Sequence, residues 1–210
     1  MDEDHGLAAA TVFDALGADY ERAFGGSAAH RVSLQRLLGD LAPRSRVLDV
    51  GSGTGRPTAL TLTEAGHDVV GVDVSPVMAE LAVRQVPGAE FECADIRELP
   101  LPDGTFDAAC AYFSLLQMSR EDQAGVLRKL ARLLVPGGHL VVATVPLDVE
   151  DFGVVFMGHE VRATSFGPEE FTELVTEAGF SVVWEQSTLF TPEYEAAVAE
   201  PQLFLHCRRA

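Results

Sequence analysis

The sequence contains few basic residues, few cysteines and no long apolar run. Lysine and arginine together number 15 against 32 aspartates and glutamates, which gives a formal net charge of -17 at pH 7. A surface this acidic repels phosphate backbones and anionic headgroups, so we expect neither nucleic acid nor a membrane surface as partner. No stretch approaches the roughly 20 apolar residues of a membrane-spanning helix. The acidic first ten residues lack the pattern of a signal peptide, so we expect a cytoplasmic protein.

Cysteine and histidine form no disulfide or metal-binding pattern. Cys93, Cys110 and Cys207 are odd in number, and each lies in an apolar run where a free thiol behaves as a small hydrophobe. His67 and His139 precede predicted strands, and we expect both at the surface. Arg128, Lys129 and Arg132 are interpreted as a solvated helix face, and Asp148, Glu150 and Asp151 as a solvated loop. The sequence therefore predicts no metal site.

Composition and periodicity indicate a single α/β domain over residues 1–210. Hydrophobic residues make up 47% of the chain and charged residues 22%, which is typical of a globular protein with a substantial core. Helical patterns over 8–24 and 29–39 predict an N-terminal helical lid at 1–43. The remainder, 44–210, would form the core.

From residue 46 onward, short apolar runs alternate with helical patterns. The predicted strands are 46–50, 68–72, 91–94, 106–113, 140–145, 180–185 and 202–207. The predicted helices are 55–65, one that begins near Pro76, 120–134 and 169–178. Strands separated by helices imply parallel βαβ units wound on both faces of one sheet. The long connection at about 146–168 has little helical pattern, and we expect it to cover the substrate site.

The strongest local signal is a strand that leads directly into a glycine-rich turn, Val47-Leu48-Asp49-Val50-Gly51-Ser52-Gly53-Thr54-Gly55. Glycines permit a tight turn and let a ligand approach the backbone where no Cβ would fit. The next strand ends in Asp73, about twenty residues later, where a carboxylate can accept both hydroxyl hydrogens of a ribose. The alternative role for Asp73 is to cap the following helix, but Ser75 suits that role better.

The glycine spacing separates two cofactors. Dinucleotide binders use G-x-G-x-x-G, whose third glycine permits close packing of helix and strand beneath a pyrophosphate. Here Arg56 follows Gly55, so the pattern is G-x-G-x-G. Asp49 would face a pyrophosphate unfavourably but suits a cationic ligand such as an amino acid ammonium. The turn therefore favours S-adenosylmethionine over NAD.

Together these motifs resemble those of the class I S-adenosylmethionine-dependent methyltransferases. The resemblance runs from about residue 46 to the C-terminus and includes Cys93-Ala94-Asp95-Ile96, Phe106-Asp107 and Val135-Pro136-Gly137-Gly138. It implies a doubly wound, seven-stranded, mostly parallel sheet of the Rossmann-like methyltransferase type, with the last strand antiparallel. The cofactor would be S-adenosyl-L-methionine and its product S-adenosyl-L-homocysteine.

The resemblance also implies which residues hold the cofactor. Asp49 and the glycine turn would hold its methionine part, Asp73 its ribose and Asp95 its adenine amino group. Tyr20 would close over it from the N-terminal helix. The implied set is Tyr20, Asp49, Gly51, Ser52, Gly53, Gly55, Asp73, Val74, Met78, Asp95, Ile96 and Ala111.

The catalytic residues are less constrained, because an activated methyl donor needs alignment and exclusion of water more than a fixed catalytic group. Gln117 lies near the carboxyl end of the fourth strand, where it can orient a polar acceptor but cannot act as a base. His159 in the long connection titrates near neutrality and is the candidate base. An exposed histidine without a role is an equally good interpretation.

The candidate substrate residues are Tyr112, Ser114, Phe156 and Arg162. Arg162 suits an acidic substrate group, but it can equally pair with a neighbouring glutamate. Four apolar residues after the fourth strand are interpreted as core: Phe113, Leu115, Leu116 and Met118.

The sequence thus predicts an enzyme that transfers a methyl group from S-adenosylmethionine to O, N or C of a small-molecule metabolite. The alternative is a protein of the same fold that binds the cofactor as a non-methylating catalyst or binding protein. A nicotinamide-dependent oxidoreductase is disfavoured by Asp49 and Arg56. The acceptor molecule and the choice between monomer and homodimer stay open.

Overall fold

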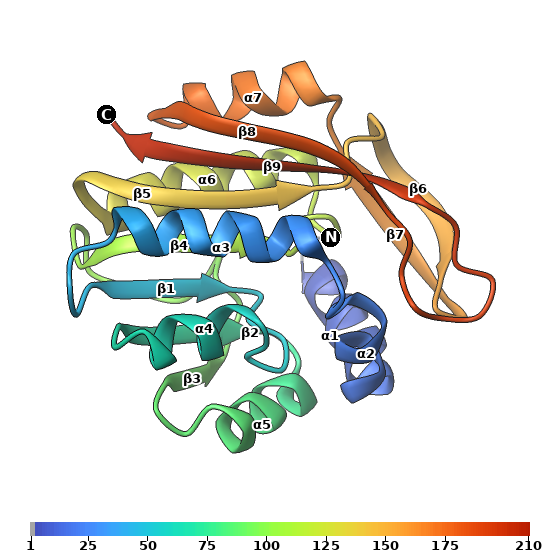
Figure 1. Cartoon of the computed structure of the whole chain (residues 1–210). Helices are drawn as coiled ribbons and strands as arrows, with labels where there is room; N and C mark the ends of the chain where they lie inside the picture. The colour runs from blue at the N-terminus through green and yellow to red at the C-terminus, as the bar shows by residue number, and fades with distance from the viewer. Residues whose placement is uncertain (1–2) are drawn as a thin grey trace.

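The computed structural model describes residues 3–210, with side chains from residue 8 onward. A central sheet carries helices on both faces, and a separate β-hairpin projects beyond one of its ends (Figure 1). The strands of the sheet are β1 (Arg46–Val50), β2 (Asp68–Asp73), β3 (Glu90–Cys93), β4 (Phe106–Tyr112), β5 (Leu134–Thr144), β8 (Phe180–Phe190) and β9 (Glu200–Arg209). The hairpin consists of β6 (Val149–Phe156) and β7 (His159–Ser165).

The order of strands in the sheet is β3-β2-β1-β4-β5-β9-β8. Strands β1 to β5 run parallel, and β9 is antiparallel to both β5 and β8. The predicted fold class is therefore confirmed, with the bounds of β1 as expected. The chain leaves β1 toward β2 on one side and returns as β4 on the other. Such a switch point opens a crevice at the carboxyl ends of the strands, where open α/β sheets bind ligands.

The helices pack on both faces of this sheet. They are α1 (Glu3–Leu16), α2 (Ala18–Phe24), α3 (Ala28–Asp40), α4 (Thr58–Glu64), α5 (Pro76–Gln85), α6 (Arg120–Leu133) and α7 (Pro168–Glu177). One buried apolar cluster lies under α6 and α7, and a second lies under α3 and α4. Among the described residues, no helix is both long and apolar enough to span a membrane.

The N-terminal segment differs from the prediction, because the helix expected over 8–24 is two helices. Gly17 separates them with a φ of 48°, a conformation that interrupts a right-handed helix. Both helices lie beyond the carboxyl ends of the parallel strands (Figure 1). Asp14 anchors α1 by accepting hydrogen bonds from the Ser75 hydroxyl at 2.5 Å and the Val77 amide at 3.2 Å.

The connection at 146–168 is not a loop but the β6–β7 hairpin. Met157 and Gly158 form its two-residue turn, with φ of 49° and 86°, which matches the twist of the paired strands. The base of the hairpin is fixed next to β4, because the Thr164 amide donates to the Leu116 carbonyl at 2.7 Å. The hairpin thereby covers the carboxyl end of β4.

Three predictions of surface exposure are wrong. His67 and His139 are only 9% and 6% exposed. Lys129 turns inward, and its ammonium donates to the carbonyls of Ile96 and Leu99 at 2.6 Å each. Lys129 therefore fixes the loop that follows β3.

The glycine turn gives a test of packing in the fold. Gly55 and Gly66 both have positive φ, 79° and 88°, but a Cβ on Gly55 would lie 2.9 Å from Val86 Cγ2 while one on Gly66 meets nothing within 4 Å. We expect Gly55→Ala to lower the free energy of unfolding by about 1–3 kcal/mol more than Gly66→Ala, because only the first is overpacked. Urea denaturation measures both variants, and equal losses would contradict this assignment.

Candidate active site

A cavity of about 270 Å³ lies at the carboxyl ends of β1, β2 and β4. Side chains from α1, α2 and the hairpin also line it. Most of its lining is apolar, and the charged side chains in it come from the ends of β2 and β3 and the start of β9. The carboxyl and guanidinium groups that line it belong to Asp73, Asp95, Arg97 and Glu200.

Asp73 occupies the centre of the cofactor side of the cavity. Its Oδ2 accepts a hydrogen bond from the Gly53 amide at 2.8 Å, and its Oδ1 accepts one from the Ser75 amide at 2.9 Å. Ser75 itself caps α5, as predicted, by accepting from the Met78 amide at 3.0 Å. Each oxygen of Asp73 keeps a further lone pair, and its side chain lines the cavity. A carboxylate in this position suits two ribose hydroxyls.

The three glycines of the turn have different roles. Gly51 and Gly53 line the cavity, and a Cβ on Gly53 would project into open space. A Cβ on Gly51 would collide with the Ser114 side chain, so that position needs glycine for packing. Gly55 is absent from the lining and packs beneath the turn. Ser52 and Ala111 are likewise buried behind the wall.

Asp49 is a buried acid directly beneath the turn. Its side chain is 2% exposed, and its Oδ2 has no hydrogen-bond partner among the described residues. Burial, with a further contribution from Asp73, raises its pKa to about 7. An orphaned carboxylate oxygen is costly unless a cation or donor approaches it. Asp49 lies behind the cavity lining, so its role toward a cofactor ammonium remains a prediction.

The cavity wall that follows β2 and β3 is formed by Val74, Met78 and Ile96 together with Asp95. Burial opposes ionisation of Asp95, but the hydrogen bonds from Arg97 prevail and lower its pKa. Arg97 donates to both oxygens of Asp95 and continues to Asp122 at 2.9 Å. The ion pair therefore fixes Asp95 at the rim. Its role toward an adenine amino group remains a prediction.

Aromatic side chains form the cover over the cavity. The Tyr20 ring stacks on Phe24 at a centroid distance of 4.9 Å, and Phe24 stacks on Phe156 of the hairpin at 5.7 Å. Glu21 fixes α2 over the glycine turn by accepting from the Thr54 hydroxyl at 2.8 Å and Gln85 at 3.0 Å. Tyr20 and Phe156 thus come together above the site, although they are 136 residues apart in the sequence.

The acceptor side lies at the end of β4. Tyr112, Ser114 and Gln117 line the cavity there, but the Tyr112 hydroxyl is engaged by Ser33 at 3.0 Å. Leu115 is buried in the core, as predicted. Phe113 and Met118 are partly buried against the core clusters but also line the cavity, as does Leu116. Phe113 has a φ of 57°, which is a strained conformation for a bulky residue and is typical of functional sites.

Two residues proposed from the sequence lie outside the cavity lining. His159 begins β7 at the turn of the hairpin, opposite Phe156. Arg162 is exposed on the outer side of the hairpin and pairs with Asp151 there. Neither is placed to contact a substrate in this cavity.

Glu200 is the lining residue that the sequence did not reveal. It begins β9, two residues before the predicted strand. Burial, with a further contribution from Glu200, raises the pKa of both Tyr20 and Tyr194. Burial raises the pKa of Glu200, and a hydrogen bond at 2.9 Å from Gln202 opposes that shift. Glu200 therefore places a partly buried carboxyl in the cavity wall, near Tyr20 of the aromatic cover.

Comparisons with known proteins agree with this geometry. A family model described as "Methyltransferase domain" matches residues 47–138. A demethylmenaquinone methyltransferase of Corynebacterium urealyticum is 36% identical over 79% of this chain and 75% of its own. The 27-O-demethylrifamycin SV methyltransferase of Amycolatopsis mediterranei is 34% identical over 80% of this chain and 58% of its own.

A solved structure has the same fold along the whole length of this chain. The 1,6-didemethyltoxoflavin-N1-methyltransferase of Burkholderia thailandensis, with bound 1,6-didemethyltoxoflavin and S-adenosylhomocysteine, has a TM-score of 0.76 at 24% identity. The match covers 100% of this chain and 91% of that one.

A doubly wound sheet with an acid at the end of β2 and an apolar cavity beside it is typical of proteins that bind a nucleoside cofactor. The chain belongs to the class I S-adenosylmethionine-dependent methyltransferases. Its cofactor is S-adenosylmethionine, and it methylates a small molecule.

The pKa of Asp49 gives a prediction on pH. If Asp49 pairs with the cofactor ammonium, it must be ionised to do so, and with a pKa of about 7 it is mostly protonated at lower pH. We expect the Kd of S-adenosylhomocysteine to rise as pH falls from 7 toward 5, by up to about tenfold per unit, and to level off above 7. Calorimetry over this range measures it. The slope should vanish in Asp49→Asn and persist in the exposed control Asp68→Asn; a wild-type Kd independent of pH would refute the pairing.

Proposed function

We propose that this enzyme methylates a hydroxyl oxygen on a flat, mainly apolar small molecule, with Glu200 as the base that receives the hydroxyl proton. The observation that carries the proposal is the division of the cavity. Asp73 ends β2 and Asp95 follows β3, whereas Glu200 begins β9 and lies near Tyr20 of the aromatic cover. The names of the two relatives above specify a quinone and the O-demethyl form of a rifamycin.

The cofactor side fits S-adenosylmethionine at each of its parts. Asp73 would hold the ribose hydroxyls, and Val74, Met78 and Ile96 would flank the adenine. The open space at Gly53 and the orphaned oxygen of Asp49 fit the methionine part and its ammonium. When bound, the cofactor supplies a methyl group on a sulfonium, which needs no further activation.

The acceptor would lie between the end of β4 and the aromatic cover. Phe113 is on the sheet side, and Tyr20, Phe24 and Phe156 are on the other, so a planar ring can pack between aromatic surfaces. Gln117 and Ser114 supply the polar contacts that orient it. The Oγ of Ser114 is buried and has no partner among the described residues, so a polar group of the acceptor would satisfy it. In this arrangement α1, α2 and the hairpin act as one cover that excludes water.

Glu200 is the group best placed to manage the proton. The hydroxyl proton goes to the Glu200 carboxylate as the acceptor oxygen forms its bond to the methyl carbon, and the sulfur retains the electrons of the broken bond. A carboxylate whose pKa is raised by burial is a stronger base than one in water. Gln202 holds Oε1 at 2.9 Å, which leaves Oε2 to accept the proton.

Two further expectations rest on composition and remain predictions: that the protein does not bind nucleic acid and that it is cytoplasmic.

The proposal is tested by a screen of candidate acceptors, followed by kinetics of a Glu200 variant. Quinols, phenols and hydroxylated macrocycles are incubated with enzyme and cofactor, and O-methylated product is detected by mass spectrometry. We expect Glu200→Gln to lower kcat by about 100-fold or more, because general base catalysis typically contributes that much. Its affinity for S-adenosylhomocysteine should stay within about threefold, since Glu200 is not among the residues assigned to the cofactor.

Glu185→Gln is the matched control, because Glu185 is exposed on the neighbouring strand β8. It should retain wild-type kcat. Full activity of Glu200→Gln would exclude Glu200 as the base. Methylation of nitrogen or carbon alone across the screen would overturn the hydroxyl acceptor.

A further inference from the structure

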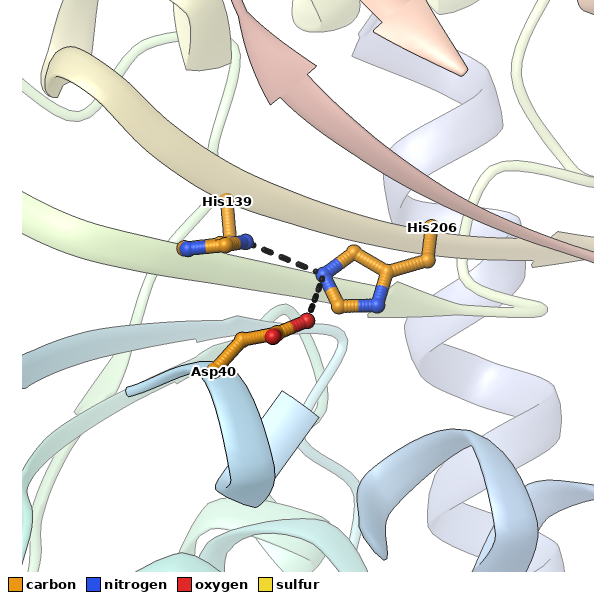
Figure 2. A group of neighbouring side chains, drawn as sticks. All are labelled: Asp40, His139 and His206. Atoms are coloured by element: carbon orange, nitrogen blue, oxygen red, sulfur yellow. Dashed lines mark hydrogen bonds and ion pairs between the residues drawn. The ribbon is translucent and has the colours of Figure 1, made fainter. Parts of the chain in front are cut away.

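A second group of chemistry-bearing side chains lies apart from the cavity, between α3 and the middle of the sheet. His139 Nδ1 is 3.1 Å from His206 Nε2, and His206 Nε2 is 3.9 Å from Asp40 Oδ2. These three atoms all lie within 4.8 Å of one another (Figure 2). They come from β5, β9 and the last residue of α3, so three separate elements fix their positions.

The alternation of side chains along the strands explains this convergence. On β5, His139 shares a face with Val141 and Ala143, both of which pack in the cluster under α3. On β9, His206 shares that face with Phe204 of the same cluster. His139 lies level with Ala108 in the sheet, whereas the cavity opens beyond Tyr112. The group is therefore separate from the methyl-transfer site.

We propose that Asp40, His139 and His206 form a binding site for a divalent zinc ion. In a tetrahedral site with zinc–ligand bonds of about 2.1 Å, neighbouring ligand atoms lie about 3.4 Å apart. The separations of 3.1 Å and 3.9 Å bracket this value. Asp40 is 46% exposed, so its carboxylate can adjust toward the ion and water can fill the fourth position.

The protonation of the histidines favours ligation. Burial lowers the pKa of both rings, to about 4 for His206, so each offers a neutral imidazole nitrogen at pH 7. Two features oppose tight binding. The guanidinium groups of Arg36 and Arg208 act on the same histidines and repel a dication. Nδ1 of His206 also has no partner among the described residues, whereas a ligating imidazole usually donates its other N–H to an acceptor. We therefore expect a Kd in the micromolar range.

A zinc ion here would join the end of α3 to β5 and β9. Its role would be structural, because the site lies away from the cavity. Without metal, the same geometry is a hydrogen bond between two neutral imidazoles beside a surface carboxylate. Zinc titration of the folded protein distinguishes the two states.

The experiment titrates untagged protein, stripped with a chelator, with zinc chloride at pH 7.5 by calorimetry. The site predicts one zinc ion per chain and, at about 100 times Kd, a rise in Tm of roughly 5 to 10 °C. Asp40→Ala should weaken binding at least tenfold, and because Asp40 is exposed, this variant should fold. Cobalt(II) should give the visible absorption of a four-coordinate ion in the wild type and lose it in the variant.

Asp103→Ala is the matched control, because Asp103 is another exposed acid that pairs with an arginine. It should bind zinc like the wild type. Absence of zinc binding at millimolar concentration would overturn the proposal. So would zinc binding that Asp40→Ala leaves unchanged, since other ligands would then hold the ion.

Discussion

Two backbone hydrogen bonds to the carboxylate of Asp73 connect the segments that form the cavity at the carboxyl ends of β1 and β2. One comes from the glycine turn at Gly53 and the other from the start of α5 at Ser75, so a single side chain joins the ends of β1 and β2. The cover depends on the same two segments. Glu21 of α2 bonds to Thr54 in the turn, and Asp14 of α1 bonds to Ser75. The group that suits the ribose therefore also positions the surfaces that would enclose the rest of the cofactor.

The parallel core of the fold was predictable because its signals are local. Arg46–Val50 was placed correctly, since a buried parallel strand is a short apolar run bounded by a turn. The hairpin at β6 and β7 was not predicted, because its two-residue turn relies on Met157 in a left-handed conformation and its strands carry exposed apolar residues. The break between α1 and α2 rests on the φ of Gly17, which a glycine permits but does not impose.

Most of the residues assigned to the cofactor were also predictable, because they lie in local motifs at the ends of strands. Eight of the twelve residues implied by the resemblance line the cavity: Tyr20, Gly51, Gly53, Asp73, Val74, Met78, Asp95 and Ile96. The acceptor half was predictable only in part. Tyr112, Ser114, Gln117 and Phe156 line the cavity, whereas His159 and Arg162 do not, because this half is assembled by long-range packing. Glu200 reaches the cavity only because β9 inserts between β5 and β8. Likewise His139 is buried because α3 covers its face of the sheet.

The central claim is that Asp73 binds the ribose of S-adenosylmethionine, and calorimetry on one variant tests it most directly. Wild-type protein and Asp73→Ala are titrated with S-adenosylhomocysteine, with NAD as the control ligand and circular dichroism to confirm folding. The account predicts micromolar binding of S-adenosylhomocysteine by the wild type, a loss of about 100-fold or more in the folded variant, and no binding of NAD. Undiminished affinity in the variant, or binding of NAD alone, would contradict it.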